Sequence, residues 1–121
     1  MEKVVFDTNF CVVPFQFKVD IFSELEKVLE EKCKIIVPTV CIEELKNVEY
    51  GMAALDLLEK KNAFFVDIPK TGNVDNSIIN FALNNGALIA TQDAELKKKA
   101  KKEGIPIVTL RQKKHLIIEY K

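Results

Sequence analysis

The sequence predicts a single α/β domain in which a parallel β-sheet is covered by helices on both faces. Short apolar runs alternate along the chain with segments in which apolar residues recur at the spacing of a helix. The apolar runs, such as KIIV at 34–37 and ALIAT at 87–91, are nearly continuous. Such runs are typical of strands that are buried on both faces of a parallel sheet. With 121 residues the chain has the length of one ordinary domain, so we expect residues 1–121 to form one unit.

The first third of the chain predicts two strands with a helix between them. Residues 3–6 are a short apolar run, which we expect to form the first buried strand. The segment DIFSELEKVLEEK at 20–32 has apolar residues at helical spacing, and Asp20 is a suitable N-cap for it. The run KIIV at 34–37 is the second expected strand, and Pro38 stops it.

The middle of the chain predicts two helices and a weaker strand. We expect helices at 40–48 and 52–61, with Gly51 marking the break between them. The run AFFVDI at 63–68 is less continuous and predicts a weaker strand.

The last third repeats the alternation of helix and strand twice. Residues 76–85 predict a helix, and Gly86 directly after them is a typical helix C-cap. A strand at 87–91, a helix at 94–103 and a strand at 105–110 follow. We expect the tail to add a further short piece.

The composition excludes several classes of protein. No stretch of about 18 apolar residues could cross a membrane, and the N-terminus lacks the pattern of a secretory signal, so we expect no membrane association and a cytoplasmic location. The three cysteines match no zinc pattern, and we expect them to be reduced and mostly buried. The formal net charge is zero, which does not decide for or against a polyanionic partner.

Two aspartates follow predicted strands directly. Asp7 comes after the first strand, and Asp93 comes after the strand at 87–91. Ligands of parallel α/β sheets bind outside the carboxyl ends of the strands. We therefore expect both carboxylates at that edge of the sheet.

Two more acids lie on apolar helix faces. Glu44 shares a helical stripe with Cys41 and Leu45, and Asp75 heads the apolar face of the helix at 76–85. A carboxylate that faces the core is costly unless it is paired or binds a metal ion.

Each acid also has an ordinary structural explanation. Asp75 and Asp93 could cap helices, and Asp7 could bond to a turn. Glu44 could meet a lysine or simply sit where its helix emerges. Four acids at one sheet edge would nevertheless repel each other strongly, which favours a divalent cation between them. Ligands that are all oxygen atoms suit Mg²⁺ or Mn²⁺. Glu95 either adds a fifth carboxylate or only complements the dipole of its helix.

Two polar residues accompany the aspartates. Asn9 and Thr91 stand beside Asp7 and Asp93. They either orient the carboxylates and water, or serve a turn and a strand end.

The four acids lie in motifs that resemble those of the PIN domain, a family of metal-dependent nucleases. The family pattern starts with a strand that ends in Asp-[Thr/Ser]-Asn, here Asp7-Thr8-Asn9, and continues with a Glu before Leu, here Glu44-Leu45. An Asp then opens a helix with Ile and Ala at fixed spacing, here Asp75, Ile78 and Ala82. The last motif is Thr-x-Asp after a strand, here Thr91-Gln92-Asp93. The resemblance covers about residues 3–110, with the motifs in the family's order.

The resemblance implies a three-layer αβα sandwich around a parallel sheet, and cleavage of single-stranded RNA. It assigns the catalytic and metal-binding tetrad to Asp7, Glu44, Asp75 and Asp93. Asn9 and Thr91 match the polar positions beside the tetrad, and Glu95 falls where some members carry an additional acid. The expected chemistry is metal-assisted hydrolysis of a phosphodiester bond.

The resemblance leaves the biological role open. The stretch ATQDAELKKKAKKEGIPIV is most similar to archaeal members related to rRNA-processing PIN proteins. Toxins of toxin–antitoxin pairs share the same tetrad, and some PIN modules in ribosome assembly bind RNA without cleaving it. The expected partners are therefore RNA, a second copy of the chain, and either an antitoxin or a ribosome-assembly partner.

Other features fit rival functions less well. The only histidine, His115, lies in a polar tail, and the four glycines form no phosphate-binding loop. A flavodoxin-like phospho-acceptor domain would need a second acid beside Asp7 and a lysine at the end of the last strand. The lysines of 97–102, followed by Arg111, Lys113 and Lys114, form either a solvated surface or a rim that contacts phosphates. Phe15 and Phe17 either pack in the core and an interface or stack on RNA bases.

Overall fold

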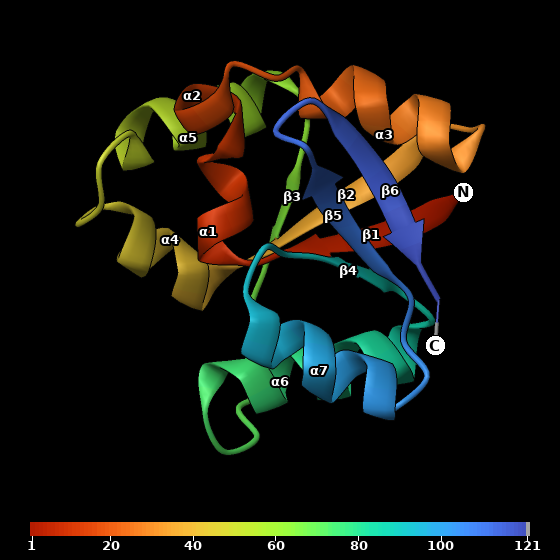
Figure 1. Ribbon diagram of the computed structural model, residues 1–121. Coiled ribbons are helices and arrows are strands. Elements are labelled where there is room, and N and C mark those ends of the chain that lie inside the picture. Colours follow the sequence, from red (N-terminus) through yellow and green to blue (C-terminus); the bar gives the residue numbers. More distant parts are fainter. Residues whose placement is uncertain (121) are drawn as a thin grey trace.

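The computed structural model describes residues 1–120 as a twisted sheet between two layers of helices (Figure 1). Its strands are β1 (Glu2–Phe6), β2 (Cys33–Pro38), β3 (Phe64–Val66), β4 (Leu88–Ala90), β5 (Ile107–Arg111) and β6 (His115–Glu119). Its helices are α1 (Thr8–Cys11), α2 (Val13–Phe17), α3 (Ile21–Leu29), α4 (Thr39–Leu45), α5 (Gly51–Lys60), α6 (Val74–Asn85) and α7 (Ala94–Lys102). Helices α6 and α7 lie side by side on one face, and α3 and α5 cover the other. The predicted three-layer α/β architecture is confirmed.

The sheet has the strand order β3-β2-β1-β4-β5-β6. The first five of these strands are parallel, as the sequence predicts; Val5 of β1, for example, pairs with Ile36 of β2 on one side and Ile89 of β4 on the other. The tail adds β6 as the further short piece expected of it, and this strand is antiparallel to β5, so the sheet is mixed at this edge. The physical reason is the connection between the two strands, which is far too short for a crossover and permits only a hairpin.

The direction of the chain reverses in the middle of the sheet. From β1 the chain moves outward to β2 and β3, and it then returns to build β4 and β5 on the opposite side of β1. Because parallel crossovers are right-handed, the two directions place their helices on opposite faces. The crossovers therefore diverge between β1 and β4. This switch point is the place where open α/β sheets bind their ligands, at the carboxyl ends of the strands.

The core explains why the strands are continuous apolar runs. Val4, Val5 and Phe6 of β1 and Ile89 of β4 are all buried, since helices cover both sheet faces. The cysteines are free, with Cys11 and Cys41 buried and Cys33 half-buried, as predicted. None of the helices within residues 1–120 combines the length and the hydrophobicity that a membrane-spanning segment needs.

The structure differs from the expected elements in three places. The segment after β1, for which no element is predicted, forms α1 and α2, which are too short to show an apolar period. The helix expected at 40–48 ends at Leu45, and Val48 lies exposed beyond it. Helix α6 begins at Val74, two residues earlier than predicted, because Asn73 caps it.

Candidate active site

Asp7 lies directly beyond β1, at the switch point of the sheet. Its backbone N–H donates to the carbonyl of Ala90 at the end of β4, which ties the two central strands together at this point. One carboxylate oxygen, Oδ1, accepts a hydrogen bond of 2.8 Å from the N–H of Phe10, so Asp7 also caps α1. The side chain is buried, with 7% of its surface exposed. Burial and the cap hold this carboxylate in one orientation.

Thr91 joins Asp7 to the next acid. Its hydroxyl is fully buried beyond β4, where it donates to Oδ2 of Asp7 and accepts a bond of 3.0 Å from the N–H of Asp93. A single hydroxyl therefore bridges the two aspartate segments. Of the two roles considered for Thr91, this geometry favours the orientation of a carboxylate.

Asp93 begins α7 in a similar way. Its Oδ1 accepts hydrogen bonds from the N–H groups of Glu95 at 2.8 Å and Leu96 at 3.4 Å. The capping explanation for Asp93 is therefore correct, and the cap uses only this one of its two carboxylate oxygens. Glu95 itself is an exposed acid in the first turn of α7. That position suits interaction with the helix dipole.

Asp75 does not cap its helix. Asn73 is the N-cap of α6, and its side chain accepts a hydrogen bond from the N–H of Asn76. The capping explanation for Asp75 is therefore wrong. Asp75 is a half-buried acid in the first turn of α6, and its carboxylate accepts no hydrogen bond from another group within residues 1–120.

Glu44 reaches the site from α4, where its neighbours Cys41 and Leu45 are buried. The prediction that Glu44 shares their core-facing stripe is wrong, because its side chain is exposed. α4 ends one turn early, so the stripe does not continue to Val48, and Glu44 borders a hollow at the surface. There it accepts a hydrogen bond from the hydroxyl of Thr8 on α1.

One hollow brings these acids together. A cavity of about 250 Å³, which we call the tetrad pocket, lies among α1, α4, α6 and the start of α7. It is lined by Asp7, Thr8, Asn9, Cys41, Glu44, Val48, Val74, Asp75, Ile78 and Asp93. All four predicted acids and Asn9 are thus in its wall. Thr91 lies buried behind the wall, and Glu95 is not among the lining residues.

Burial and neighbouring charges raise the pKa of two of the acids, Asp7 and Asp75. The pKa of Asp7 rises from 3.8 to about 6, mainly through burial and further through the charges of Asp93 and Asp75, although the bonds from Thr91 and Phe10 oppose the rise. Burial also raises the pKa of Asp75, and the charge of Asp93 adds to this effect. The pocket therefore concentrates negative charge that the neighbouring groups do not neutralise.

The donor set of the pocket fits a hard divalent cation. Four carboxylates offer only oxygen atoms, which Mg²⁺ and Mn²⁺ prefer. As the side chains stand, however, no three Asp, Glu, His or Cys groups among residues 1–120 converge tightly enough to hold an ion. Each of Glu44, Asp7 and Asp93 turns toward a hydrogen-bond donor of the protein instead. To coordinate an ion, these side chains would have to rotate within the tetrad pocket.

Two residues of the pocket were not singled out from the sequence. Thr8 holds Glu44, and its place between Asp7 and Asn9 in the first motif is the only signal that could have indicated this role. Cys41 lines the pocket as well. Burial raises the pKa of its thiol to about 11, so Cys41 stays neutral near pH 7 and is not a thiolate ligand.

Comparison with known proteins points to one family. The chain is 36% identical to Ribonuclease VapC4 of Methanocaldococcus jannaschii, with 98% of this chain and 97% of that protein covered. It is 28% identical to Ribonuclease VapC9 of Archaeoglobus fulgidus, with 95% and 87% covered. These likenesses extend over nearly the full length of the chain.

Solved structures agree with the sequence relatives. The PIN domain endonuclease Utp24 superimposes with a TM-score of 0.83 at 26% identity, covering 97% of this chain and 90% of that one. VapBC2 of Rickettsia felis, solved with a DNA fragment from its promoter, has a TM-score of 0.56 at 17% identity over 90% of this chain and 99% of the other, and shares the fold. Residues 4–113 match the family model described as a PIN-like domain. The protein therefore belongs to the PIN-domain family.

Proposed function

We propose that this protein is a divalent-metal-dependent endoribonuclease, formed by one domain over residues 1–121, that hydrolyses phosphodiester bonds of single-stranded RNA. The observation that carries the proposal is the tetrad pocket, in which Asp7, Glu44, Asp75 and Asp93 meet at the switch point of the sheet. The names of the relatives support it, since both VapC proteins are called ribonucleases and Utp24 is called an endonuclease.

The four acids would hold Mg²⁺ or Mn²⁺, and a bound ion would supply a more acidic water and neutralise charge on the scissile phosphate. The protein's own contribution is the placement of the acids. Thr91 and the N–H of Phe10 bond to the ionised form of Asp7 and so favour it over the neutral form. Thr8 keeps the exposed Glu44 over the pocket, and Asn9 adds an uncharged polar group to its wall.

A cleavage assay tests the proposal. A labelled single-stranded RNA is incubated with the wild-type protein and Mg²⁺ or Mn²⁺, and beside it with D7N, which keeps the N-cap but removes the charge. The matched control is D56N, because Asp56 is an exposed acid of α5 outside the tetrad pocket. We expect cleavage by wild type and D56N and loss of cleavage in D7N and in chelator. Equal activity of D7N and wild type would exclude the tetrad mechanism.

A second candidate is the toxin ribonuclease of a toxin–antitoxin pair. The likeness to two VapC proteins favours this role, whereas the resemblance of the stretch ATQDAELKKKAKKEGIPIV to rRNA-processing PIN proteins fits an rRNA-processing nuclease. Induced expression in a bacterial host separates the two, since a toxin arrests growth and its D7N variant does not. A cytoplasmic location is part of either proposal, and the three free cysteines fit a reducing compartment. RNA binding without turnover under any divalent metal would instead indicate a non-catalytic module. A homodimer stays a prediction.

A further inference from the structure

Two further hollows continue from the tetrad pocket across the surface toward α2. The first, of about 280 Å³, shares Asn9 and Asp93 with the tetrad pocket. The second, of about 470 Å³, shares Phe17 with the first. Neighbouring hollows have lining residues in common, so they adjoin one another in a row, and we call the three together the track. We call the outer one the basic hollow, because its wall contains Lys18, Lys27, Lys113 and Lys114.

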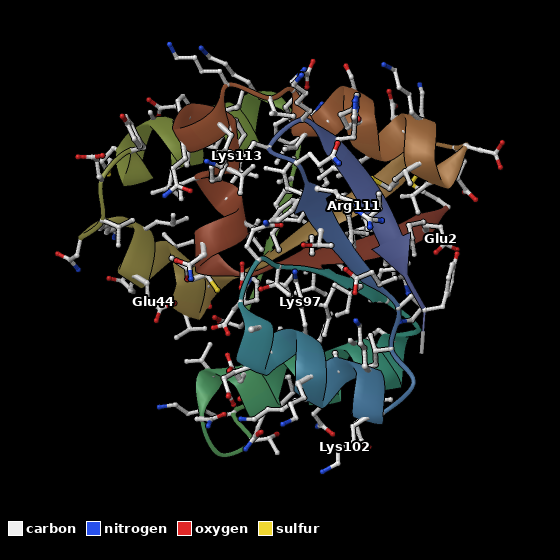
Figure 2. The ribbon with its side chains drawn as sticks, viewed as in Figure 1. Glu2, Glu44, Lys97, Lys102, Arg111 and Lys113 are labelled. Atoms are coloured by element: carbon white, nitrogen blue, oxygen red, sulfur yellow. The ribbon has the colours of Figure 1, made fainter. Side chains whose placement is uncertain are left out.

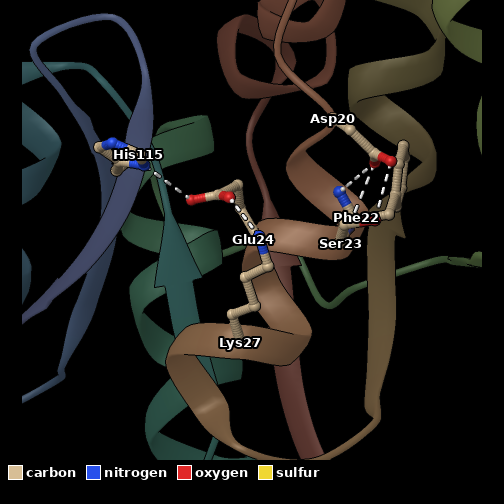
Figure 3. A network of polar contacts seen from close by, with 6 residues as sticks. All are labelled: Asp20, Phe22, Ser23, Glu24, Lys27 and His115. Carbon is tan, nitrogen blue, oxygen red and sulfur yellow. Dashed lines mark hydrogen bonds and ion pairs between the residues drawn. The ribbon is translucent and has the colours of Figure 1, made fainter.

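The two acids of the basic hollow are already occupied. Asp20 caps α3 and accepts from the N–H groups of Phe22 and Ser23 and from the Ser23 hydroxyl (Figure 3). Glu24 lies 3.5 Å from Lys27 and 3.4 Å from His115. Local partners therefore satisfy both carboxylates.

The remaining lysines keep their charge available. Lys18, Lys113 and Lys114 are exposed, and none of them forms an ion pair with a residue among 1–120. Figure 2 shows Lys113 at the β5–β6 turn beside α2, away from Glu44 at the far side of the site. A free cluster of cations at the end of a track from an acidic pocket suits a polyanion that enters the pocket at one phosphate.

The backbone holds two of these lysines in a costly conformation. Lys18 has φ 56° and Lys113 has φ 58°, both in the left-handed region that glycine prefers. In the β5–β6 turn, Gln112 with φ 54° precedes Lys113, and the N–H of Lys114 donates to the carbonyl of Arg111. Such a turn favours Asn-Gly at its centre. Lys113 therefore occupies the turn position where glycine is the most favourable residue.

The middle of the track suits a base. Phe17 is half-buried at the end of α2 and lines both outer hollows, so part of its ring faces the track. Gln92 is held in the wall because its Oε1 accepts from the Thr109 hydroxyl at 2.8 Å and from the Leu110 N–H at 2.6 Å. Aromatic rings next to cations are the usual means by which proteins bind single-stranded nucleic acids.

We propose that single-stranded RNA runs from the tetrad pocket across Phe17 into the basic hollow, where Lys18, Lys113 and Lys114 bind its phosphates. This inference rests on the proposed function and adds the path of the substrate to it. The opposite exit from the site is less suitable. A cavity of about 730 Å³ adjoins the tetrad pocket at Val74. Glu43 and Asp67 line it, with Lys70 as the only cation in its wall, so it lacks the cluster of free lysines that the basic hollow has.

The test measures RNA binding apart from cleavage. A fluorescein-labelled oligouridylate of about 16 nucleotides is titrated against D7N, in which cleavage is blocked, and against D7N with K113Q and K114Q. Each phosphate contact of a single strand contributes about 0.7 to the slope of log affinity against log salt. Loss of two contacts therefore lowers that slope by about 1.4 and the affinity at 0.1 M salt by about 25-fold.

The matched control removes two lysines elsewhere. Lys32 and Lys60 are exposed and precede β2 and β3, which lie on the other side of β1 from the β5–β6 turn that carries Lys113 and Lys114. K32Q with K60Q removes the same charge, and we expect it to leave the affinity nearly unchanged. If both double variants weaken binding equally, or if K113Q with K114Q has no effect, the proposed path is wrong.

Two further readouts separate this inference from the proposed function. K113G relieves the strained turn, so we expect it to raise the melting temperature while it weakens RNA binding. A purely structural role for Lys113 predicts no loss of binding, and that result would overturn the inference. In the cleavage assay the lysine variants should raise KM with little change in kcat. If wild type cleaves no RNA but binding still depends on Lys113 and Lys114, the path is supported and the nuclease proposal fails. If wild type cleaves RNA normally but binding does not depend on Lys113 and Lys114, the nuclease proposal is supported and the path is wrong.

Discussion

Replacement of Asp7 by Asn should stabilise the metal-free protein while it abolishes cleavage. The pKa of Asp7 rises from 3.8 to about 6 because the carboxylate is buried near other acids. At about 1.4 kcal/mol per pKa unit, its ionisation destabilises the folded state by about 3 kcal/mol near neutral pH. Asn fills nearly the same space and its Oδ1 can cap α1. Its amide NH2 cannot accept the bond from the Thr91 hydroxyl, which offsets part of the gain. We therefore expect D7N to gain up to about 3 kcal/mol, which for a domain of this size is roughly 10 °C in melting temperature.

The pH dependence of this difference has a definite sign. Above about pH 6 Asp7 is ionised in the folded and the unfolded chain, so the full destabilisation is present. As the pH falls from 6 toward 3.8, the folded protein takes up the proton first, and below 3.8 the carboxyl is neutral in both states. The advantage of D7N should therefore shrink toward zero between neutral pH and about pH 4.

Thermal or urea unfolding of both proteins in chelator, across this pH range, measures the effect. Saturating Mn²⁺ serves as a second readout, because it should raise the melting temperature of wild type and have much less effect on D7N. If D7N in chelator is no more stable than wild type at neutral pH, or if the difference does not depend on pH, the reasoning about the buried charge is refuted.

Three further predictions concern single positions. T91V removes the hydroxyl that bridges Asp7 and Asp93, so we expect the free energy of unfolding to fall by about 1–3 kcal/mol. We also expect a further rise in the pKa of Asp7, which the pH–rate profile measures. An unchanged profile would contradict the bridge. E44Q alters an exposed side chain, so unfolding should be unchanged in chelator while activity and stabilisation by Mn²⁺ fall; a large loss of stability would indicate a structural role instead. G51A places a Cβ 1.6 Å from the carbonyl oxygen of Leu45, so we expect the free energy of unfolding in urea to fall by several kcal/mol. Near-wild-type stability would show that the backbone between α4 and α5 can move to make room for this Cβ.

Most of the fold could be predicted because its local signals agree. Continuous apolar runs predicted the five parallel strands, and Asp20 and Gly86 marked helix ends that the structure confirms. The short helices α1 and α2 could not be predicted, because four or five residues show no period. The antiparallel β6 also has no clear signal, since its turn uses lysine and glutamine where a hairpin usually has Asn-Gly.

The candidate site was predictable to a different degree for each acid. Asp7 and Asp93 follow strands, so the topology of a parallel sheet brings them together. Asp75 was correctly placed at its helix start, but only the structure shows that Asn73 is the cap. Glu44 was placed on a buried stripe because helical spacing alone does not show where α4 ends. The hydroxyl of Thr8 and the bridge through Thr91 are long-range contacts that no local pattern encodes.

The pairing of β1 with β4 also determines when the centre can exist during synthesis. Val4 pairs with Leu88, and the Thr91 hydroxyl meets a carboxylate that lies 84 positions earlier in the chain. A nascent polypeptide that has not yet released β4 from the ribosome lacks one half of the proposed centre, and its early aspartate has no bridging hydroxyl. The proposed nuclease centre therefore cannot form before β4 has left the ribosome.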